Sequence, residues 1–357
     1  MTGAEMNIVG FPELTNREQE VLRCIIQNFI VTASPVASRT LVERYRLNIS
    51  SATVRGAMNS LESKGLLDHP HTSSGRVPTE HGYRHYVNSL MQVSVLSKEE
   101  RQILDTLQNY LTSDIDDAVQ SAARILARLS NLLAVVVTPR LGQGVFRKIE
   151  LVSISSSRVL VVLTIESGIV KTFSVEVQAE MESGELERVA RFLNERLQGH
   201  KLNEISRKIK EMLSDYDGRD HSGLIRVFID SADTIFDDHQ LRKFHFGGVE
   251  YMALQPEFND LSSYKGIVEL LENEDMIIHL FDDYKGEGDN REVQIRIGRE
   301  NKIQQVEQCS VVSANYHYGG IKGTIGLVGP TRMNYSRMVA LVEQLANRFS
   351  VYSPGGG

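Results

Sequence analysis

Two side chains suited to pairing with DNA bases, Arg55 and Asn59, lie four residues apart in SSATVRGAMNSLESKG, residues 50–65. That spacing places them on one face of a helix. Arginine and asparagine form paired hydrogen bonds with base edges in the major groove. Small outward residues such as Ala52 and Gly56 permit the close approach that these bonds require. The segment therefore predicts a helix that reads base edges.

The rest of this segment predicts how the helix is held. Its other side is apolar and should be buried, with Val54, Ala57, Met58 and Leu61. Ser50 or Ser51 caps the start, and Gly65 ends the helix. The helix start, with Ser51 and Thr53, is expected to read or approach bases as well.

Two helical patterns precede this segment. Thr15 and Glu18 fit a capping box, so a first helix is expected near residues 15–31. The residues TASP break it, and a second short helix is expected from Ser38 through Tyr45. Helix, short helix, tight turn and helix is the order of a helix-turn-helix. The alternative is a small packing domain that does not contact DNA.

A polar segment, PHTSSGRVPTEHGYR at residues 70–84, follows the third helix, and almost nothing in it could build a core. A loop of this kind after a recognition helix is a wing, which binds phosphates without reading sequence. Thr79 caps another helix behind it. The predicted DNA backbone contacts are Arg39, His71, Ser73, Ser74 and Arg76. Alternatively, His71 is an ordinary surface histidine and the glycines and prolines only shape turns.

Charge is unevenly distributed along the chain. Its formal net charge is -7, yet residues 12–90 carry nine Lys and Arg against seven Asp and Glu. A mildly basic N-terminal module joined to an acidic body suggests a polyanionic partner. No apolar run is long enough for a membrane helix and no signal peptide is evident, so a cytoplasmic protein is expected. The two cysteines, Cys24 and Cys309, are expected to be buried apolar residues.

The body of the chain predicts an α+β fold. A capping box at Ser97 and a stripe near residues 114–130 predict two helices, either a linker pair or part of a dimer seam. Four β-rich runs follow from Leu132, then helical patterns at 185–198, 202–214 and 222–238, and an irregular connector HFGGVEYMALQPEF. A helix at 260–273, strands including MIIHLF, EVQIRIG, QCSVVSANYH and GTIGLVG, and a helix at 333–349 complete it. Strands that return after helices suggest a sheet domain with an inserted helical segment.

Other chemistry is weakly indicated. The glycines between Gly319 and Gly326 lack the order of a phosphate-binding loop and are better explained as a turn. Aspartate and histidine pairs near residues 237–239, 245 and 282–283 are more typical of solvated loops than of metal sites. No catalytic constellation stands out, so neither an enzyme, a metal nor a cofactor is predicted. A bound small effector remains open.

Two runs closely resemble the family of heat-inducible transcription repressors called HrcA. They are SSATVRGAMNSLESKGLLDHPHTSSGRVPTEHGYRHYV, which resembles its recognition helix and wing, and GTIGLVGPTRMNYSRMVALVEQLANRF, which contains its GPTRMxY signature. Arg332 and Tyr335 lie in that signature, and a structural role tying strand to helix is expected. The chain departs from the family pattern after Arg55, where Gly56 and Ala57 replace an asparagine and an acidic residue.

The resemblance implies an N-terminal winged helix-turn-helix, a GAF-like sheet domain and an inserted dimerisation segment. The corresponding boundaries are 12–95, a helical linker 96–130, the sheet domain 131–182 with 255–350, the insert 183–254 and a tail 351–357. It implies a homodimeric repressor on an inverted-repeat operator of chaperonin and chaperone genes, with the chaperonin as partner and modulation by heat. The alternative is a ligand-sensing winged-helix regulator whose GAF-like domain binds a small effector.

Overall fold

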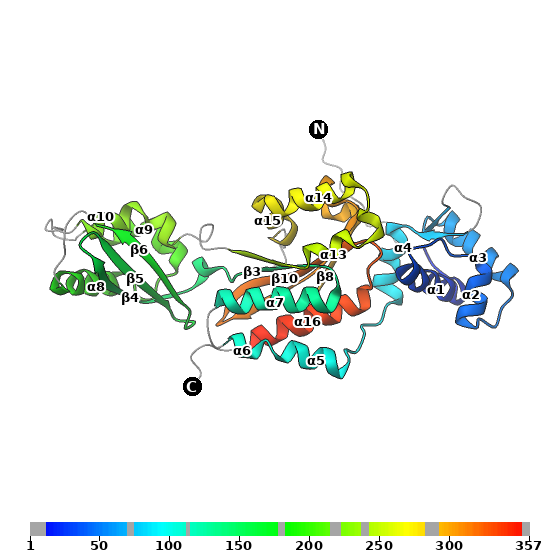
Figure 1. Ribbon diagram of the computed structural model, residues 1–357, viewed down its shortest axis with the longest axis horizontal. Helices are drawn as coiled ribbons and strands as arrows, with labels where there is room; N and C mark the ends of the chain where they lie inside the picture. The colour runs from blue at the N-terminus through cyan, green and yellow to red at the C-terminus, as the bar shows by residue number, and fades with distance from the viewer. Residues whose placement is uncertain are drawn as a thin grey trace.

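The computed structural model describes residues 12–69, 75–111, 115–177, 183–214, 223–236, 243–282 and 293–351. These residues form an elongated molecule of three parts (Figure 1). The N-terminal module lies at one end, a sheet domain in the middle and a second sheet domain at the other end. None of the helices in these ranges has the length and apolar content that crossing a membrane requires.

The N-terminal module begins with the three helices expected from the sequence. They are α1 (Asn16–Thr32), α2 (Ser38–Tyr45) and α3 (Ser51–Ser63). The Thr15 capping box forms, and Ser50 rather than Ser51 caps α3. All four apolar residues predicted for the inner side of α3 are buried. Helical spacing and caps therefore located this module correctly.

Glu18 joins α1 to α3. Its carboxylate accepts hydrogen bonds from Lys64 Nζ at 2.8 Å and from Ser60 Oγ at 2.6 Å. The bond from Lys64, followed by those from Ser60 and Thr15, lowers the pKa of the Glu18 carboxyl to about 2 against burial, which raises it. The Glu18 residue is 6% exposed. A charged carboxylate therefore stabilises the contact between the two helices.

A short antiparallel ladder follows α3. Strands β1 (Leu67–Asp68) and β2 (Val77–Pro78) pair, and a further bridge joins Val36 to Arg76. Gly75 lies against the backbone here, because a Cβ on it would be 2.7 Å from the carbonyl carbon of Pro35. Thr79 then caps α4 (Glu80–His85), as expected, and a π-helical turn, η1 (Tyr86–Leu90), ends the module.

The middle domain contains a five-stranded antiparallel sheet in the order β7-β3-β10-β9-β8. Its strands are β3 (Leu133–Val137), β7 (Phe244–Gly247), β8 (Gln294–Ile297), β9 (Cys309–Tyr318) and β10 (Ile321–Pro330). The turn between β9 and β10 is made by Gly319 and Gly320, whose φ angles are 57° and 78°. Gly319 and Gly320 therefore form a hairpin turn, as expected, whereas Gly323 and Gly326 lie within β10.

Helices cover both faces of this sheet (Figure 1). One face carries α5 (Lys98–Asp105), α6 (Gln108–Leu111), α7 (Ile115–Ser130) and α16 (Tyr335–Val351). The other carries α13 (Val249–Ala253), η3 (Pro256–Phe258), α14 (Leu261–Glu272) and α15 (Glu274–Asp282), while η4 (Gly298–Asn301) and η5 (Gln304–Val306) connect β8 to β9. Alternate residues of β3 enter two different hydrophobic cores. Within residues 96–130, α7 packs on the sheet, and α5 and α6 pack against α7.

The second sheet differs from the sequence-based grouping, which assigned residues 131–182 to one sheet domain. After η2 (Leu141–Gln143), strands β4 (Phe146–Ser155), β5 (Arg158–Ile165) and β6 (Val170–Glu176) form a separate three-stranded sheet. It packs with α8 (Ser183–Leu197), α9 (Leu202–Met212), α10 (Leu224–Asp230) and α11 (Ala232–Phe236). Both edges of β3 are paired, with β7 and β10, while β4–β6 pair with one another. The inserted domain therefore contains strands as well as helices.

Three local predictions were wrong. MIIHLF, expected as a strand, lies in helix α15, where Ile277, Leu280 and Phe281 are buried at helical spacing. The Asn273 side chain accepts a hydrogen bond from the Met276 N–H at 3.1 Å and so begins this helix. A six-residue apolar run alone cannot distinguish strand from helix. The expected connector at 245–258 contains β7, α13 and η3, and the expected helix at 222–238 is divided into α10 and α11.

The Glu18 contact predicts a pH-dependent stability. Because the folded pKa lies below the ordinary value of 4.5, the stabilisation is present above pH 4.5 and disappears as the pH falls towards 2. Glu18→Gln should lower the free energy of unfolding by about 1–2 kcal/mol at pH 6 after allowance for solvent screening. Calorimetric melting of the full chain at several pH values measures this change in the free energy of unfolding.

The matched control is Glu20→Gln on the same helix, where the side chain is exposed. This variant should melt like the unmodified protein throughout. The difference between Glu18→Gln and the unmodified protein should narrow between pH 5 and pH 2. A difference that stays constant over this range would contradict the assigned role of the Glu18 charge.

Two glycines of the N-terminal module predict opposite effects. Gly75→Ala should destabilise the module by roughly 1–3 kcal/mol, because its Cβ would overlap the Pro35–Val36 backbone. Gly56→Ala should stabilise α3 by up to about 1 kcal/mol, because no atom lies within 4 Å of its Cβ position. Hydrogen exchange of the α1–α3 amides measures both. Equal protection in the two variants would refute the tight packing at Gly75.

Candidate nucleic-acid interface

A groove of about 440 Å³ lies between the start of α2, the outer side of α3 and the β1–β2 ladder. It brings together three of the predicted DNA-contacting residues, Arg55, Asn59 and Arg76. The other lining residues are Val36, Ala37, Ser38, Met58, His69 and Gly75. Residues distant in sequence thus form one concave, polar surface.

The outer side of α3 is open. Arg55, Gly56 and Asn59 are exposed, and nothing lies within 4 Å of the Cβ position of Gly56. Within the described part of the chain, the Arg55 guanidinium has no ion-pair partner. An unpaired guanidinium on an exposed helix face can bind an external acceptor without first losing an internal bond.

Asn59 is held by a network that the sequence did not reveal. Arg76 donates to Asn59 Oδ1 at 3.2 Å and to Glu62 Oε2 at 2.8 Å, while its Nη1 lies 3.0 Å from His69 Nδ1. Arg76 therefore lies along α3, with its side chain 19% exposed. The bond to Oδ1 leaves the Asn59 amide nitrogen as a donor.

The starts of α2 and α3 meet at the groove. Ser38 Oγ and Ser51 Oγ are 2.9 Å apart, and Thr53 contributes its N–H and hydroxyl to the cap at Ser50. Ser51 and Thr53 are thus partly engaged inside the module. Helix N-termini carry partial positive charge, so their convergence favours an anion such as phosphate.

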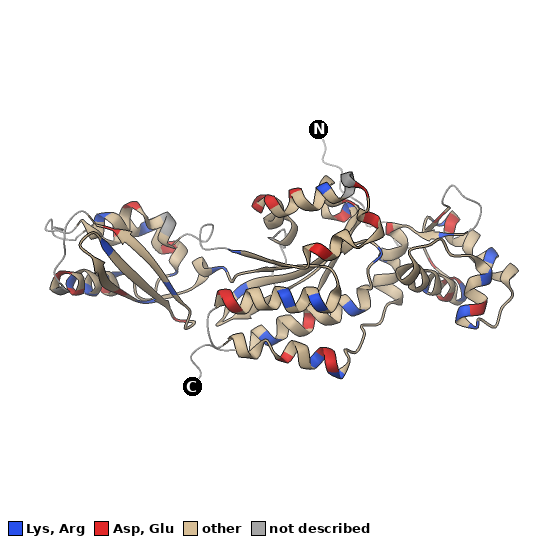
Figure 2. Ribbon diagram, in the orientation of Figure 1, with Lys and Arg blue, Asp and Glu red and all other residues tan. Residues whose placement is uncertain are grey.

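Of the residues predicted to contact the DNA backbone, some lie in the described part of the chain and others do not. Arg39 lies on α2 with its side chain 86% exposed, and its Nε is 2.9 Å from Glu43 Oε1. This ion pair is between exposed groups and so contributes little stability. His71, Ser73 and Ser74 lie outside the described residues, so their roles stay predictions. Figure 2 marks the Lys and Arg positions of the module in blue along its ribbon.

Sequence reasoning missed Ser38, Glu62 and His69 at this surface. Ser38 lies at the first position of α2, and His69 directly follows β1. Since both elements flank α3, their positions could have predicted that these two residues lie at this surface. The sequence gives no sign that Glu62 pairs with Arg76, because the two residues meet only when the segment after the loop folds back against α3. In the described ranges, no group of three His, Cys, Asp or Glu side chains could hold a metal ion.

The two signature residues lie far from the groove. Tyr335 begins α16, and its hydroxyl donates to Thr331 O at 2.6 Å and is 2.7 Å from Ser310 Oγ. Arg332 contacts Glu257, Gln255 and the Ile30 carbonyl of α1. Arg332 was expected to join a strand to a helix of one domain, and it instead joins the sheet domain to the N-terminal module.

The sequence profile of the HrcA protein C terminal domain matches residues 116–339. The heat-inducible transcription repressor HrcA of Chlorobium phaeobacteroides (strain BS1) is 38% identical over 351 residues, covering 95% of this chain and 98% of that protein. The repressor of the same name from Natranaerobius thermophilus is 36% identical over 342 residues, covering 94% and 96%.

A solved structure shares the fold. The crystal structure of a hypothetical protein, 23% identical, matches with a TM-score of 0.66 over 97% of this chain and 100% of that chain. The matches in sequence extend over nearly the whole length, including the N-terminal module and the GPTRMNY segment. The chain therefore belongs to the HrcA family of heat-inducible transcription repressors.

Proposed function

We propose that the N-terminal module is a winged helix-turn-helix that inserts α3 into the major groove of an operator. Arg55 and Asn59 read base edges there, while Gly56 permits close approach. The observation that carries this proposal is an exposed Arg55, without an ion-pair partner in the described ranges, beside an Asn59 that accepts a hydrogen bond from Arg76. Orientation before binding lowers the entropy cost of recognition.

The DNA backbone is bound around this centre. Ser51 and Thr53 approach it at the start of α3, where two helix N-termini favour phosphate. Arg39 and Arg76 supply positive charge on either side, and His71, Ser73 and Ser74 would extend the contacts along the wing. These contacts position the module on the duplex, and the base contacts provide the specificity.

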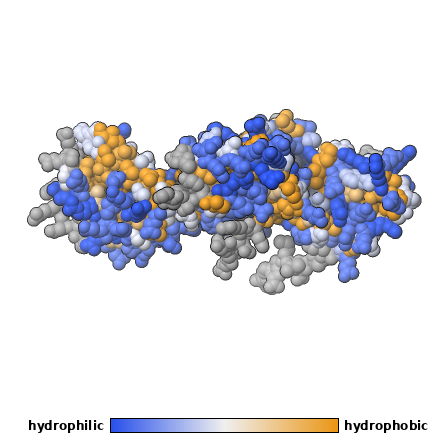
Figure 3. Space-filling view, turned by 90° about the horizontal axis from the view of Figure 1, so that it is seen from below, coloured by the Kyte–Doolittle hydropathy of each residue, from blue (hydrophilic) through white to orange (hydrophobic). Residues whose placement is uncertain are grey.

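The repressor acts as a homodimer joined through the inserted domain. One face of the β4–β6 sheet is buried, whereas Val152 and Val170 on its other face are 51% and 50% exposed, and nearby Ile154 is 57% exposed. Figure 3 shows hydrophobic surface on this domain. An exposed apolar face on a sheet in which β4 is an edge strand suits a second copy. Two modules on a two-fold axis would read an inverted repeat.

The family resemblance supplies the physiological setting. The operator would precede chaperonin and chaperone genes in the cytoplasm, and the chaperonin would keep the repressor active until heat diverts it to unfolded proteins. The sheet domain would serve as a GAF-like connection between the DNA-binding modules and the dimer interface. Adding purified chaperonin to a titration of the protein onto operator DNA tests this partner. The chaperonin should raise the fraction of the repressor that is able to bind the operator.

Operator binding tests the role of Arg55. The full chain is titrated onto a labelled inverted repeat of the chaperonin-gene type and onto a scrambled duplex, at two salt concentrations. Arg55→Ala should weaken operator binding by about 1–3 kcal/mol, roughly 5–150-fold, and should reduce the preference over scrambled DNA. Binding to the scrambled duplex should change much less.

Arg17→Ala is the matched control, since it removes the same charge from an exposed position on α1 that does not line the groove. It should retain the operator preference. If the unmodified protein binds both duplexes equally and its affinity falls steeply with salt, it contacts only the DNA phosphates and not the base edges. Equal losses in the two variants would argue against base reading by Arg55.

Sedimentation tests the dimer. Val152→Glu combined with Ile154→Glu should shift the full chain from dimer to monomer, because two charges would be buried in the interface. Operator affinity should fall with it, while half-site binding persists. Val351→Glu, at an 85% exposed position that ends α16, should remain dimeric. A dimeric double variant would exclude this face as the interface.

A further inference from the structure

The junction between the N-terminal module and the sheet domain consists of a few localised contacts. Arg84 forms an ion pair with Glu300 and donates to the Ile295 carbonyl at 2.7 Å. The Tyr83 and Tyr335 rings pack at a centroid distance of 5.8 Å, and both residues are buried. The linker adds a hydroxyl contact of 2.6 Å between Ser94 and Ser336.

Arg332 also lies at this junction, where it contacts both domains at once. Its Nε and Nη2 donate to the two carboxylate oxygens of Glu257 at 2.6 and 3.1 Å, and Nη2 also donates to Gln255 Oε1 at 3.0 Å. Its Nη1 donates to the Ile30 carbonyl at 2.8 Å. Only the planar five-donor guanidinium can make this set of bonds, so lysine cannot replace it.

The acceptor on the module is well suited to a cation. Ile30 lies in the last turn of α1, which ends at Thr32. The carbonyls of the last turn receive no hydrogen bond from an N–H of their own helix, so the Ile30 carbonyl can accept one from Arg332. The C-terminus of a helix also carries partial negative charge. The Arg332 side chain is 12% exposed, so the bond is little weakened by water. Arg332 thus holds the end of α1 to the sheet domain.

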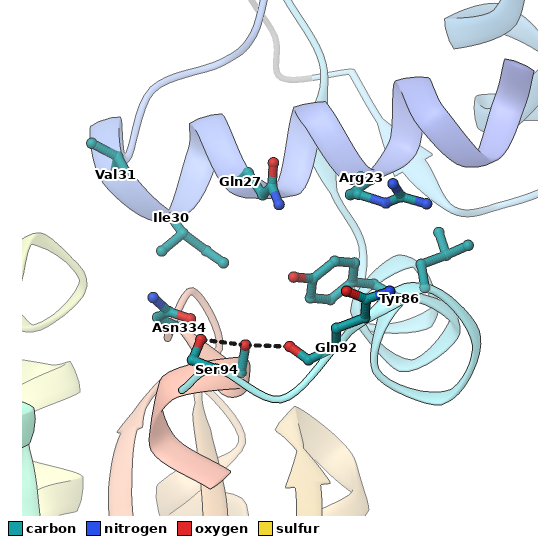
Figure 4. Close-up of a pocket in the computed structure, with 10 residues that line it drawn as sticks. Arg23, Gln27, Ile30, Val31, Tyr86, Gln92, Ser94 and Asn334 are labelled. Carbon is teal, nitrogen blue, oxygen red and sulfur yellow. Dashed lines mark hydrogen bonds between the residues drawn. The ribbon is translucent and has the colours of Figure 1, made fainter. Parts of the chain in front are cut away.

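The junction between the two domains is open on one side. Beside the aromatic pair lies an open pocket of about 490 Å³, lined by Gln27 and Ile30 of α1 and by Gln92, Ser94 and Asn334 across from them (Figure 4). On this side of the junction, the bond from Arg332 to the Ile30 carbonyl joins the end of α1 to the sheet domain. The Tyr83–Tyr335 contact alone would act as a pivot.

We infer that Arg332 is a positioning residue for DNA recognition, which fixes the orientation of the N-terminal module and thereby the half-site spacing that the dimer reads. This inference rests on the proposed binding of an inverted repeat by a homodimer. The module lies at the opposite end of the elongated chain from the inserted domain (Figure 1). A change of angle at the junction would therefore displace α3 relative to its counterpart in a dimer.

The test measures affinity for inverted repeats whose spacer is shortened or lengthened by one or two base pairs, with a single half-site as reference. The unmodified chain should prefer one spacing. Arg332→Ala and Arg332→Lys should bind that operator about tenfold more weakly, as expected if roughly one-tenth of the dimers hold both modules in the competent orientation. Their half-site affinity should be unchanged, and their preference among spacings should be reduced.

Two further variants complete the design. Glu257→Gln keeps an acceptor but removes the charge, so it should cause a smaller change in the same direction even if an Arg332 variant folds poorly. Arg348→Ala, which breaks an ion pair of 2.6 Å to Asp105 within the sheet domain, should keep the normal spacing preference. An unaltered spacing preference in the Arg332 variants, or an equal loss on the half-site, would overturn the inference. Failure of the unmodified chain to prefer any inverted repeat would instead refute the proposed function.

Discussion

The paired strands β9 and β10 are the part of the molecule on which the rest depends. They are hydrogen-bonded along the whole of both ten-residue strands, and almost every side chain on them is buried. Helices can cover both faces only because both faces are apolar. The GPTRMNY segment leaves the end of β10 and starts α16, so it is held rigidly. That rigidity allows Arg332 to hold a second domain.

The inserted domain leaves and re-enters the sheet at neighbouring points. Val137 at the end of β3 pairs with Phe244 at the start of β7. The Thr138 N–H donates to the Lys243 carbonyl at 3.0 Å, and the Lys243 N–H donates to Thr138 Oγ1 at 2.9 Å. Because its two ends meet, a whole domain can be accommodated without disturbing the sheet. The fold therefore places the inserted domain and the N-terminal module at opposite ends of the molecule (Figure 1).

The N-terminal module combines firm internal packing with an open outer surface. Glu18, Lys64 and Ser60 join α1 to the inner side of α3, and Gly75 allows the ladder to approach Pro35. The outer side of α3 keeps its polar groups exposed. Glu18 and Arg76 are paired inside the module, whereas Arg55 has no ion-pair partner among the residues that the structure describes.

The sequence by itself determined the features that depend on neighbouring residues. The caps at Thr15, Thr79 and Ser97, the buried side of α3 and the glycine turn between β9 and β10 were predicted because caps, helical spacing and turns are local. Only the tertiary structure decided that β4–β6 form their own sheet and which partners Arg76 and Arg332 take. Those choices join residues far apart in the chain, where periodicity carries no information about which strand or charge is adjacent.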